Sequence, residues 1–139
     1  MGIRTPVMFR WKGTIEPRMD TANPVSSIDI ATTIIEVCGA SPAEGMQGIN
    51  VLDTQKLAGR DAIFSETYAH DFTSVDSSLY YRIILTRPWK LILPDGVNQH
   101  GALPELYNIS VDPHEQMDLA ESNPGLVRDL KDQIENWWN

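Results

Sequence analysis

The sequence contains very little of what disulfide-bonded and metal-binding proteins use. Cys38 is the one cysteine among 139 residues, so an internal disulfide and a cysteine-rich metal site are both excluded. The three histidines, His70, His100 and His114, are too scattered for their spacing alone to define a metal motif. The chain also has neither a glycine-rich phosphate loop after a strand nor an HExxH motif. Taken on its own, the sequence offers no complete catalytic constellation.

Basic residues are scarce as well. The chain carries 11 Lys and Arg against 19 Asp and Glu, and its formal net charge is −8. This balance argues against nucleic acid or a membrane surface as the main partner, because both attract faces rich in Lys and Arg. No apolar run approaches the roughly 20 residues that cross a bilayer, and no signal peptide is evident in the first residues. Hydrophobic residues still make up 42% of the chain, which is enough for a packed core. The sequence leaves the localisation of the protein unknown.

The first sixty residues predict one strand and one helix. Residues 7–11 are apolar and aromatic after a proline, which is typical of a short buried strand. A helix is expected over residues 27–38, because Ser26 and Asp29 have capping-box spacing and Gly39 suits the position after the last turn. Asp29 is interpreted as a first-turn acid that favours the helix dipole. The apolar positions of the helix fall on one face, which is expected to be buried: Ile28, Ala31, Ile34, Ile35 and Cys38.

Residues 61–139 predict a small antiparallel sheet packed by a C-terminal helix. Four stretches rich in β-branched and aromatic residues are separated by turns, at residues 62–68, 80–86, 89–93 and 105–109. A helix is expected over residues 124–138, because Pro124 suits its first position. Its apolar stripe consists of Leu126, Leu130, Ile134, Trp137 and Trp138. Hairpins followed by a helix predict an α+β fold, not a parallel α/β sheet.

His70 and Asp71 are the candidate substrate-proximal residues. Both lie in a polar loop directly after the strand predicted at residues 62–68, and loops at strand ends commonly carry binding groups. An ordinary exposed surface histidine is the alternative interpretation. The sequence predicts no metal ligands: its acidic cluster lacks the spacing and the glycine of a calcium loop, so a solvated surface is favoured. That cluster consists of Asp112, Glu115, Asp118 and Glu121.

Five blocks of sequence follow one another across nearly the whole chain. They are GIRTPVMFRWKG at 2–13, VSSIDIATTI at 25–34, GMQGINVL at 45–52, YRII with WKLI at 81–92, and ELYNI with DPHE and DLA at 105–120. Each block is weak alone, but in this order they resemble the C-terminal part of a type I sulfatase, from the arylsulfatase family of the alkaline phosphatase-like superfamily. Lys12 and Thr32 depart from the pattern, because they stand where that family often has proline.

The resemblance implies a division of the chain and the absence of a reaction centre. Residues 1–60, with the strand at 7–11 and the helix at 27–38, would be the end of the catalytic domain, and residues 61–139 the C-terminal subdomain. The calcium or magnesium ion and the formylglycine of the full-length enzyme would be held upstream of Arg4. Cys38 does not match the family's C-x-P-x-R motif, because Ala40 stands at the required proline and Pro42 at the required arginine. We therefore expect no catalytic residue, metal or cofactor in this chain, which would be inactive alone and support the structure and substrate cleft of the intact enzyme.

Two alternatives to a sulfatase fragment stay open. Sister enzymes that act on phosphonate or phosphate esters share the fold, and a stand-alone non-catalytic interaction module would keep the same C-terminal pattern. The expected partners are the missing N-terminal catalytic domain and, in the intact enzyme, a small sulfate ester. The resemblance also places the strand at 7–11 in the large sheet of that domain. Without that sheet, the exposed edge and apolar side chains of this N-terminal arm are expected to join chains into a homo-oligomer, which light scattering on chains with and without residues 1–25 tests.

Overall fold

The computed structural model describes residues 5–138, and the chain divides into two compact units. The boundary lies between Arg60 and Asp61. We call residues 5–60 the helical unit and residues 61–138 the sheet unit, and describe each by itself. Whether the helical unit belongs to a catalytic domain stays a prediction. Within residues 5–138, no helix is both long enough and apolar enough to cross a bilayer.

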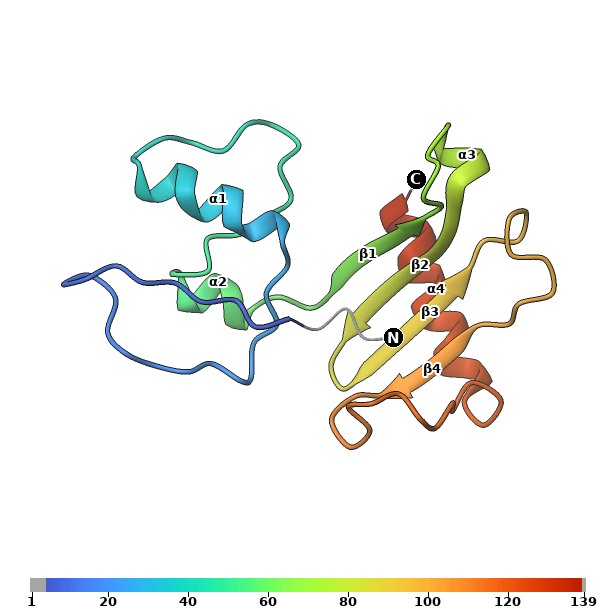
Figure 1. Cartoon of the computed structure of the whole chain (residues 1–139). Helices are drawn as coiled ribbons and strands as arrows, with labels where there is room; N and C mark the ends of the chain where they lie inside the picture. Colours follow the sequence, from blue (N-terminus) through green and yellow to red (C-terminus); the bar gives the residue numbers. More distant parts are fainter. Residues whose placement is uncertain (1–4, 139) are drawn as a thin grey trace. The chain divides into compact units, whose positions relative to one another are not determined.

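The sheet unit is an antiparallel sheet with a long helix against one face (Figure 1). Within the described residues its four strands follow chain order: β1 (Ile63–Tyr68), β2 (Leu79–Thr86), β3 (Trp89–Pro94) and β4 (Glu105–Asn108). A short helix, α3 (Val75–Ser78), precedes β2, and α4 (Pro124–Trp138) ends the described chain. The α+β prediction is confirmed.

The core of the sheet unit lies between the sheet and α4. Alternate residues of a strand point to one face, so Ile84 of β2, Leu91 of β3 and Leu106 of β4 line up across the paired strands. All three are fully buried, and Leu130 and Ile134 of α4 pack on them. At the end of α4 the ring of Trp137 stacks on Phe64 of β1, with centroids 4.7 Å apart and planes within 5°. The predicted apolar stripe of this helix is therefore the packed one.

The helical unit departs from the sequence prediction at its start. Its described helices are α1 (Ile28–Val37) and α2 (Thr54–Ala58), but residues 7–11 form neither helix nor strand. The predicted strand is therefore wrong for this structure. A strand needs a neighbouring chain to pair its backbone N–H and C=O groups, and within the described residues none pairs with 7–11.

Helix α1 presents its apolar face to solvent, the reverse of the predicted orientation. Its buried side chains are Asp29, Thr32 and Thr33, whereas Ile28 is 50% and Ile34 55% exposed. The polar side faces inward because it binds the backbone of the segment after Gly45: Asp29 accepts from the Ile49 N–H at 2.9 Å, and Thr33 Oγ1 accepts from the Val51 N–H at 3.0 Å.

Two further details of α1 follow from this orientation. Cys38, expected in a core, is exposed, because it lies on the outward side of the helix end. Gly48 passes so close to α1 that a Cβ there would collide with the carbonyl oxygen of Ile28 and the hydroxyl of Thr32. Glycine is the residue that permits this approach of two backbones.

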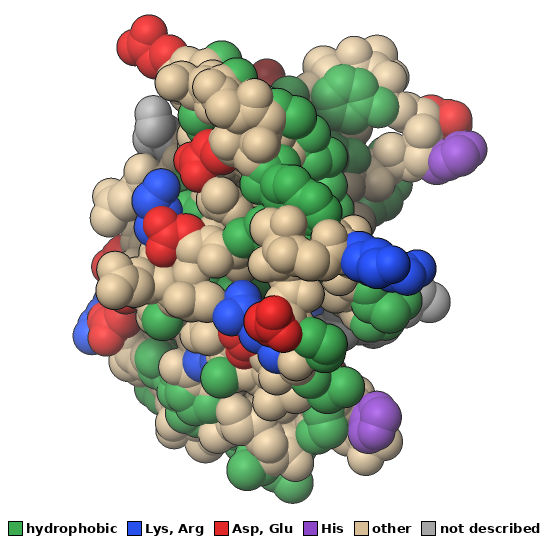
Figure 2. All heavy atoms as spheres, turned by 90° about the vertical axis from the view of Figure 1, so that its left-hand side faces the viewer, with side chains coloured by type: hydrophobic (Ala, Val, Ile, Leu, Met, Phe, Trp, Pro, Cys, Tyr) green, Lys and Arg blue, Asp and Glu red, His purple; other side chains and the backbone are tan. Residues whose placement is uncertain are grey.

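The helical unit has very little core of its own. Among its described residues, Val51 and Leu57 are the buried large hydrophobic side chains. Ten others are exposed: Val7, Met8, Phe9, Trp11, Met19, Ile28, Ile30, Ile34, Val37 and Met46. Figure 2, turned by 90° about the vertical axis from Figure 1, shows green apolar side chains at the surface of the molecule. A monomer usually hides most of its large apolar side chains, so this surface has the composition of an interface.

Candidate functional site

The loop that follows β1 is a compact structure and not an open tail. The Ala69 N–H donates to the Ser78 carbonyl at 2.7 Å, which closes the base of the loop. The buried Ser78 hydroxyl accepts from the Thr73 N–H at 3.1 Å. Ser74 caps α3 by accepting from the Ser77 N–H at 3.3 Å. The backbone of residues 69–78 is therefore held in place while its tip faces solvent.

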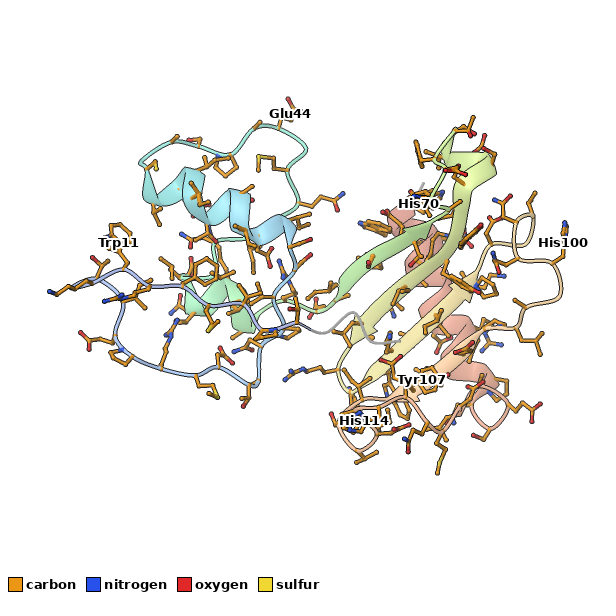
Figure 3. All side chains as sticks on the ribbon, viewed as in Figure 1. Trp11, Glu44, His70, His100, Tyr107 and His114 are labelled. Carbon is orange, nitrogen blue, oxygen red and sulfur yellow. The ribbon has the colours of Figure 1, made fainter. Side chains whose placement is uncertain are left out.

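His70 and Asp71 are both exposed in this loop. Figure 3 shows His70 at the end of β1, His114 at the opposite end of the sheet and His100 at a loop tip. The structure therefore does not bring the three histidines together. The position of the loop suits a binding role, and proximity of His70 and Asp71 to a substrate stays a prediction.

A second loop is tied to the first one. The side chain of Asn98 donates to the carbonyl of Asp76 at 2.7 Å and to the carbonyl of Leu79 at 3.0 Å. Asp95 shapes its turn by accepting from the N–H groups of Val97 and Asn98. Sequence reasoning missed Asn98, because its partners lie about twenty residues away in the chain.

A buried ion pair secures the acidic segment after β4. Lys90 Nζ lies 2.6 Å from Glu115 Oε2, and the two side chains are 4% and 9% exposed. Lys90 alternates with Leu91, so it lies on the face of the sheet away from α4. Its cross-strand neighbour is Tyr107, whose hydroxyl donates to Glu105 at 2.6 Å. Burial, and then this hydrogen bond, raises the pKa of Tyr107 well above its ordinary value.

Three of the four acidic residues of this segment make structural contacts, while Asp118 and Glu121 are exposed, as expected for the solvated surface that the sequence favoured. Glu115 pairs with Lys90, and Asp112 accepts from the N–H groups of Gln116 and Met117 at 2.8 Å. Asp118 accepts from the N–H groups of Leu106 and Ala120. The carboxylates of Asp112, Glu115 and Asp118 therefore help to hold the fold of this segment.

A second buried ion pair organises the helical unit. The guanidinium of Arg60 binds both carboxylate oxygens of Asp29 at 2.6 Å, and the side chains are 9% and 0% exposed. Burial alone would raise the pKa of Asp29, but the bonds from Arg60, the Ile49 N–H and the Ser26 N–H outweigh it and hold the pKa below its ordinary value. The bond from Ser26, at 2.7 Å, is one half of the predicted capping box. Asp29 is thus a buried anchor and more than a helix-dipole acid.

The described residues do not fit the metal and the formylglycine that the sequence resemblance implied for a full-length enzyme. Among residues 5–138 no three His, Cys, Asp or Glu side chains are grouped so that they could hold a metal ion. Cys38 stands exposed after α1 and is followed by Gly-Ala-Ser-Pro. No chemical step through either group is therefore assigned to these residues.

Comparison with known proteins identifies the family. The model of the family "N-sulphoglucosamine sulphohydrolase, C-terminal" matches residues 1–138. The chain belongs to this sulfatase C-terminal family. The family therefore explains why all five sequence blocks occur in order, and the predicted resemblance is confirmed.

Three relatives show how much of a sulfatase this family segment represents. An N-acetylgalactosamine-6-O-sulfatase of Bacteroides thetaiotaomicron is 25% identical over 97% of this chain and 27% of its own length. The crystal structure of Ps i-CgsB has a TM-score of 0.60 at 24% identity, over 83% of this chain and 24% of that one. BT4656, solved with D-glucosamine-2-N,6-O-disulfate as its substrate, has a TM-score of 0.51 at 18% identity. This match covers 78% of the present chain and 24% of BT4656. The chain thus spans about a quarter of each relative.

Proposed function

We propose that this chain is the C-terminal part of a sulfatase, in which the helical unit completes the catalytic domain and the sheet unit supports the substrate cleft. The family match along residues 1–138 supports a sulfatase origin. The relatives, of which the chain spans about a quarter, support a catalytic domain as the missing partner. The substrates that the names of these two relatives indicate, an N-acetylgalactosamine 6-O-sulfate and a disulfated glucosamine, support a sulfated sugar as the ester.

The observation that carries this proposal is the incomplete core of the helical unit. Its described residues bury Val51 and Leu57 but leave ten large apolar side chains exposed. On α1 the exposed face holds isoleucines and a valine, because the polar face is occupied by the Asp29 and Thr33 bonds. Transfer of such side chains out of water is worth roughly 1.5–3 kcal/mol each when burial is complete. A catalytic domain packed on α1 and on residues 7–11 supplies that burial.

The chemistry of sulfate ester hydrolysis would then come from outside this chain. We infer that calcium or magnesium and a formylglycine belong to the catalytic domain of the parent enzyme. The formylglycine would supply the activated nucleophile, and the metal ion would neutralise charge on the sulfate oxygens. The residues described in this chain contribute support and no nucleophile.

The first prediction is that the purified chain alone has no catalytic activity. We expect no hydrolysis of an aryl sulfate above background, with or without calcium or magnesium, because the chain would lack the nucleophile and the ions' ligands. The same assay includes an aryl phosphate and a phosphonate ester, which tests the sister enzymes. Turnover that follows the protein through purification would contradict the proposal. If the chain joined to its own catalytic domain also shows no ester hydrolysis, that result would instead favour a stand-alone interaction module.

The second prediction concerns His70 in the intact enzyme. We expect His70→Ala to raise KM for the sugar substrate about tenfold, the effect of one lost polar contact to the substrate. Asp71→Asn should act in the same direction. His100→Ala is the matched control, since His100 is also exposed but lies at the tip of another loop. Unchanged kinetics for His70→Ala would remove this loop from the substrate cleft.

Association of two chains through residues 7–11 also stays a prediction. Val7, Met8, Phe9 and Trp11 are exposed, and Met8 is 89% exposed. The arm therefore has the apolar surface that association requires, although it forms no strand. In the intact enzyme the same side chains would lie against the catalytic domain.

A further inference from the structure

The loop that carries His70 is tied to another segment of the sheet unit by one side chain. Residues 69–78, which we call the His70 loop, join β1 to β2. The amide of Asn98, in the loop after β3, donates to the carbonyl of Asp76 at 2.7 Å and to that of Leu79 at 3.0 Å. A side-chain amide has two N–H donors, so both are used. The two bonds span the point at which the His70 loop returns to the sheet.

Asn98 stands on a base that is fixed independently of that loop. The loop after β3 leaves the same end of the sheet (Figure 1), and it is anchored to β2 on both sides of Asn98. Before it, the Asp95 N–H donates to the Tyr80 carbonyl at 2.8 Å. After it, the Tyr81 hydroxyl donates to Gln99 at 3.1 Å. The Asn98 side chain therefore reaches its neighbour from a fixed point.

The His70 loop itself has little that would fix the position of its tip. Its own hydrogen bonds, such as that from the Thr73 N–H to the Ser78 hydroxyl at 3.1 Å, join the loop to itself. The ring of Phe72 meets the Tyr68 ring edge-on and is still 57% exposed. Segments with few buried contacts open most easily. A tie to a neighbouring segment therefore decides where the tip lies.

The two Asn98 bonds contribute little to the stability of the whole sheet unit. The carbonyl of Asp76 lies in an exposed position, so water can replace the Asn98 amide there. Asn98 also lies outside the core that the strands form with α4. Loss of these bonds is therefore expected to free the loop without unfolding the sheet.

We propose that Asn98 is a positioning residue that acts on the substrate through the His70 loop. The inference rests on the proposed function, in which His70 and Asp71 lie near the substrate. A loop that is already in place does not have to be ordered when the substrate binds, and that saving increases affinity. Loss of the Asn98 bonds should therefore raise KM and leave kcat nearly unchanged.

The first test is hydrogen exchange of the full chain. Asn98→Asp keeps the shape of the side chain but replaces both donors by oxygens, which cannot bind the two carbonyls. We expect the amides of Thr73 and Ser77, which donate within the His70 loop, to exchange about tenfold faster. The Leu91 amide in the core should keep its protection, which shows that the variant is folded.

Gln99→Glu is the matched control for this variant. It makes the same change of charge one residue away, but Gln99 accepts from the Tyr81 hydroxyl, and a carboxylate accepts equally well. Asn98→Gln keeps both donors and should exchange more slowly than Asn98→Asp. Unchanged exchange in Asn98→Asp, or equally fast exchange in Gln99→Glu, would overturn the inference.

The second test is the kinetics of the intact enzyme with N-acetylgalactosamine 6-sulfate, the ester that the name of one relative indicates. Asn98→Asp should raise KM about tenfold, as His70→Ala should, and change kcat less than about twofold. The double variant should be no worse than His70→Ala alone, because both changes remove the same contact.

The kinetic outcomes separate this inference from the proposed function. An unchanged KM in Asn98→Asp beside a raised KM in His70→Ala would overturn this inference alone. Additive increases in the double variant would do so as well, because they would mean that Asn98 acts by another route. An unchanged KM in both single variants would overturn the role of the His70 loop in the proposed function and this inference with it.

Discussion

Replacing Asp29 by Asn is expected to destabilise the helical unit by about 3–5 kcal/mol, the usual consequence of removing one partner of a buried ion pair. The carboxylate of Asp29 is fully buried, and it accepts from Arg60 twice and from the backbone of Ser26 and Ile49. The amide would leave the Arg60 charge uncompensated. The measurement is the hydrogen-exchange protection of the Ile49 and Val51 amides in the full chain.

The same pair predicts a dependence of stability on pH. The folded pKa of Asp29 is lowered, so its contribution is present above the unfolded pKa of about 3.9 and is lost as the pH falls through the folded pKa. Protection of Ile49 in the wild type should therefore fall at acidic pH, and Asp29→Asn should remove this component. Asp61→Asn is the matched control, because Asp61 is exposed. Equal protection in the wild type and Asp29→Asn would show that the pair does not hold this unit.

Leu130→Ala is expected to cost the sheet unit about 2–5 kcal/mol, the range for a fully buried leucine. Leu130 is 2% exposed and packs on the strand residues Ile84 and Leu91. Its loss leaves a cavity that the sheet cannot fill, because the strands are held in register. The measurement is a urea unfolding curve followed by tryptophan fluorescence, to which Trp137, stacked on Phe64, and the other three tryptophans of the chain contribute.

Leu103→Ala is the matched control for this variant. Leu103 is 75% exposed, so its truncation should change the free energy of unfolding by less than about 0.5 kcal/mol. A cost for Leu130→Ala below 2 kcal/mol would mean that α4 is not docked on the sheet in solution. An equal loss of unfolding free energy in Leu130→Ala and Leu103→Ala would also mean that α4 is not docked on the sheet.

The candidate site shows the limit of local reasoning. The loop that carries His70 was found because it directly follows a strand, and the structure keeps it there. A pocket whose lining includes Arg82, Asp95 and Trp138 was not foreseen, because Arg82 and Asp95 come from different segments and Trp138 from the far end of the chain. Only pairing of β2 with β3 and packing of α4 bring those segments together.

The sequence by itself determined the sheet unit. Apolar runs of strand length, the turns between them and the stripe from Leu126 to Ile134 are local signals, and the elements they predict pack on one another within the same unit. The five blocks of sequence also determined the family. The strands, the C-terminal helix and the sequence blocks can all be recognised from residues that lie close together in the chain.

The tertiary structure alone decided which faces are buried and which charges are paired. Asp29 and Arg60 are 31 positions apart, and Lys90 and Glu115 are 25 apart, so neither pair has a local signature. Helix α1 hides Asp29 and exposes Ile34 because hydrogen bonds to the segment at Ile49 and Val51 fix its orientation. Residues 7–11 have the composition of a strand but, within the described chain, no strand to pair with. Hydrophobic periodicity says which residues can be buried, and burial itself requires a partner surface that only the folded molecule provides.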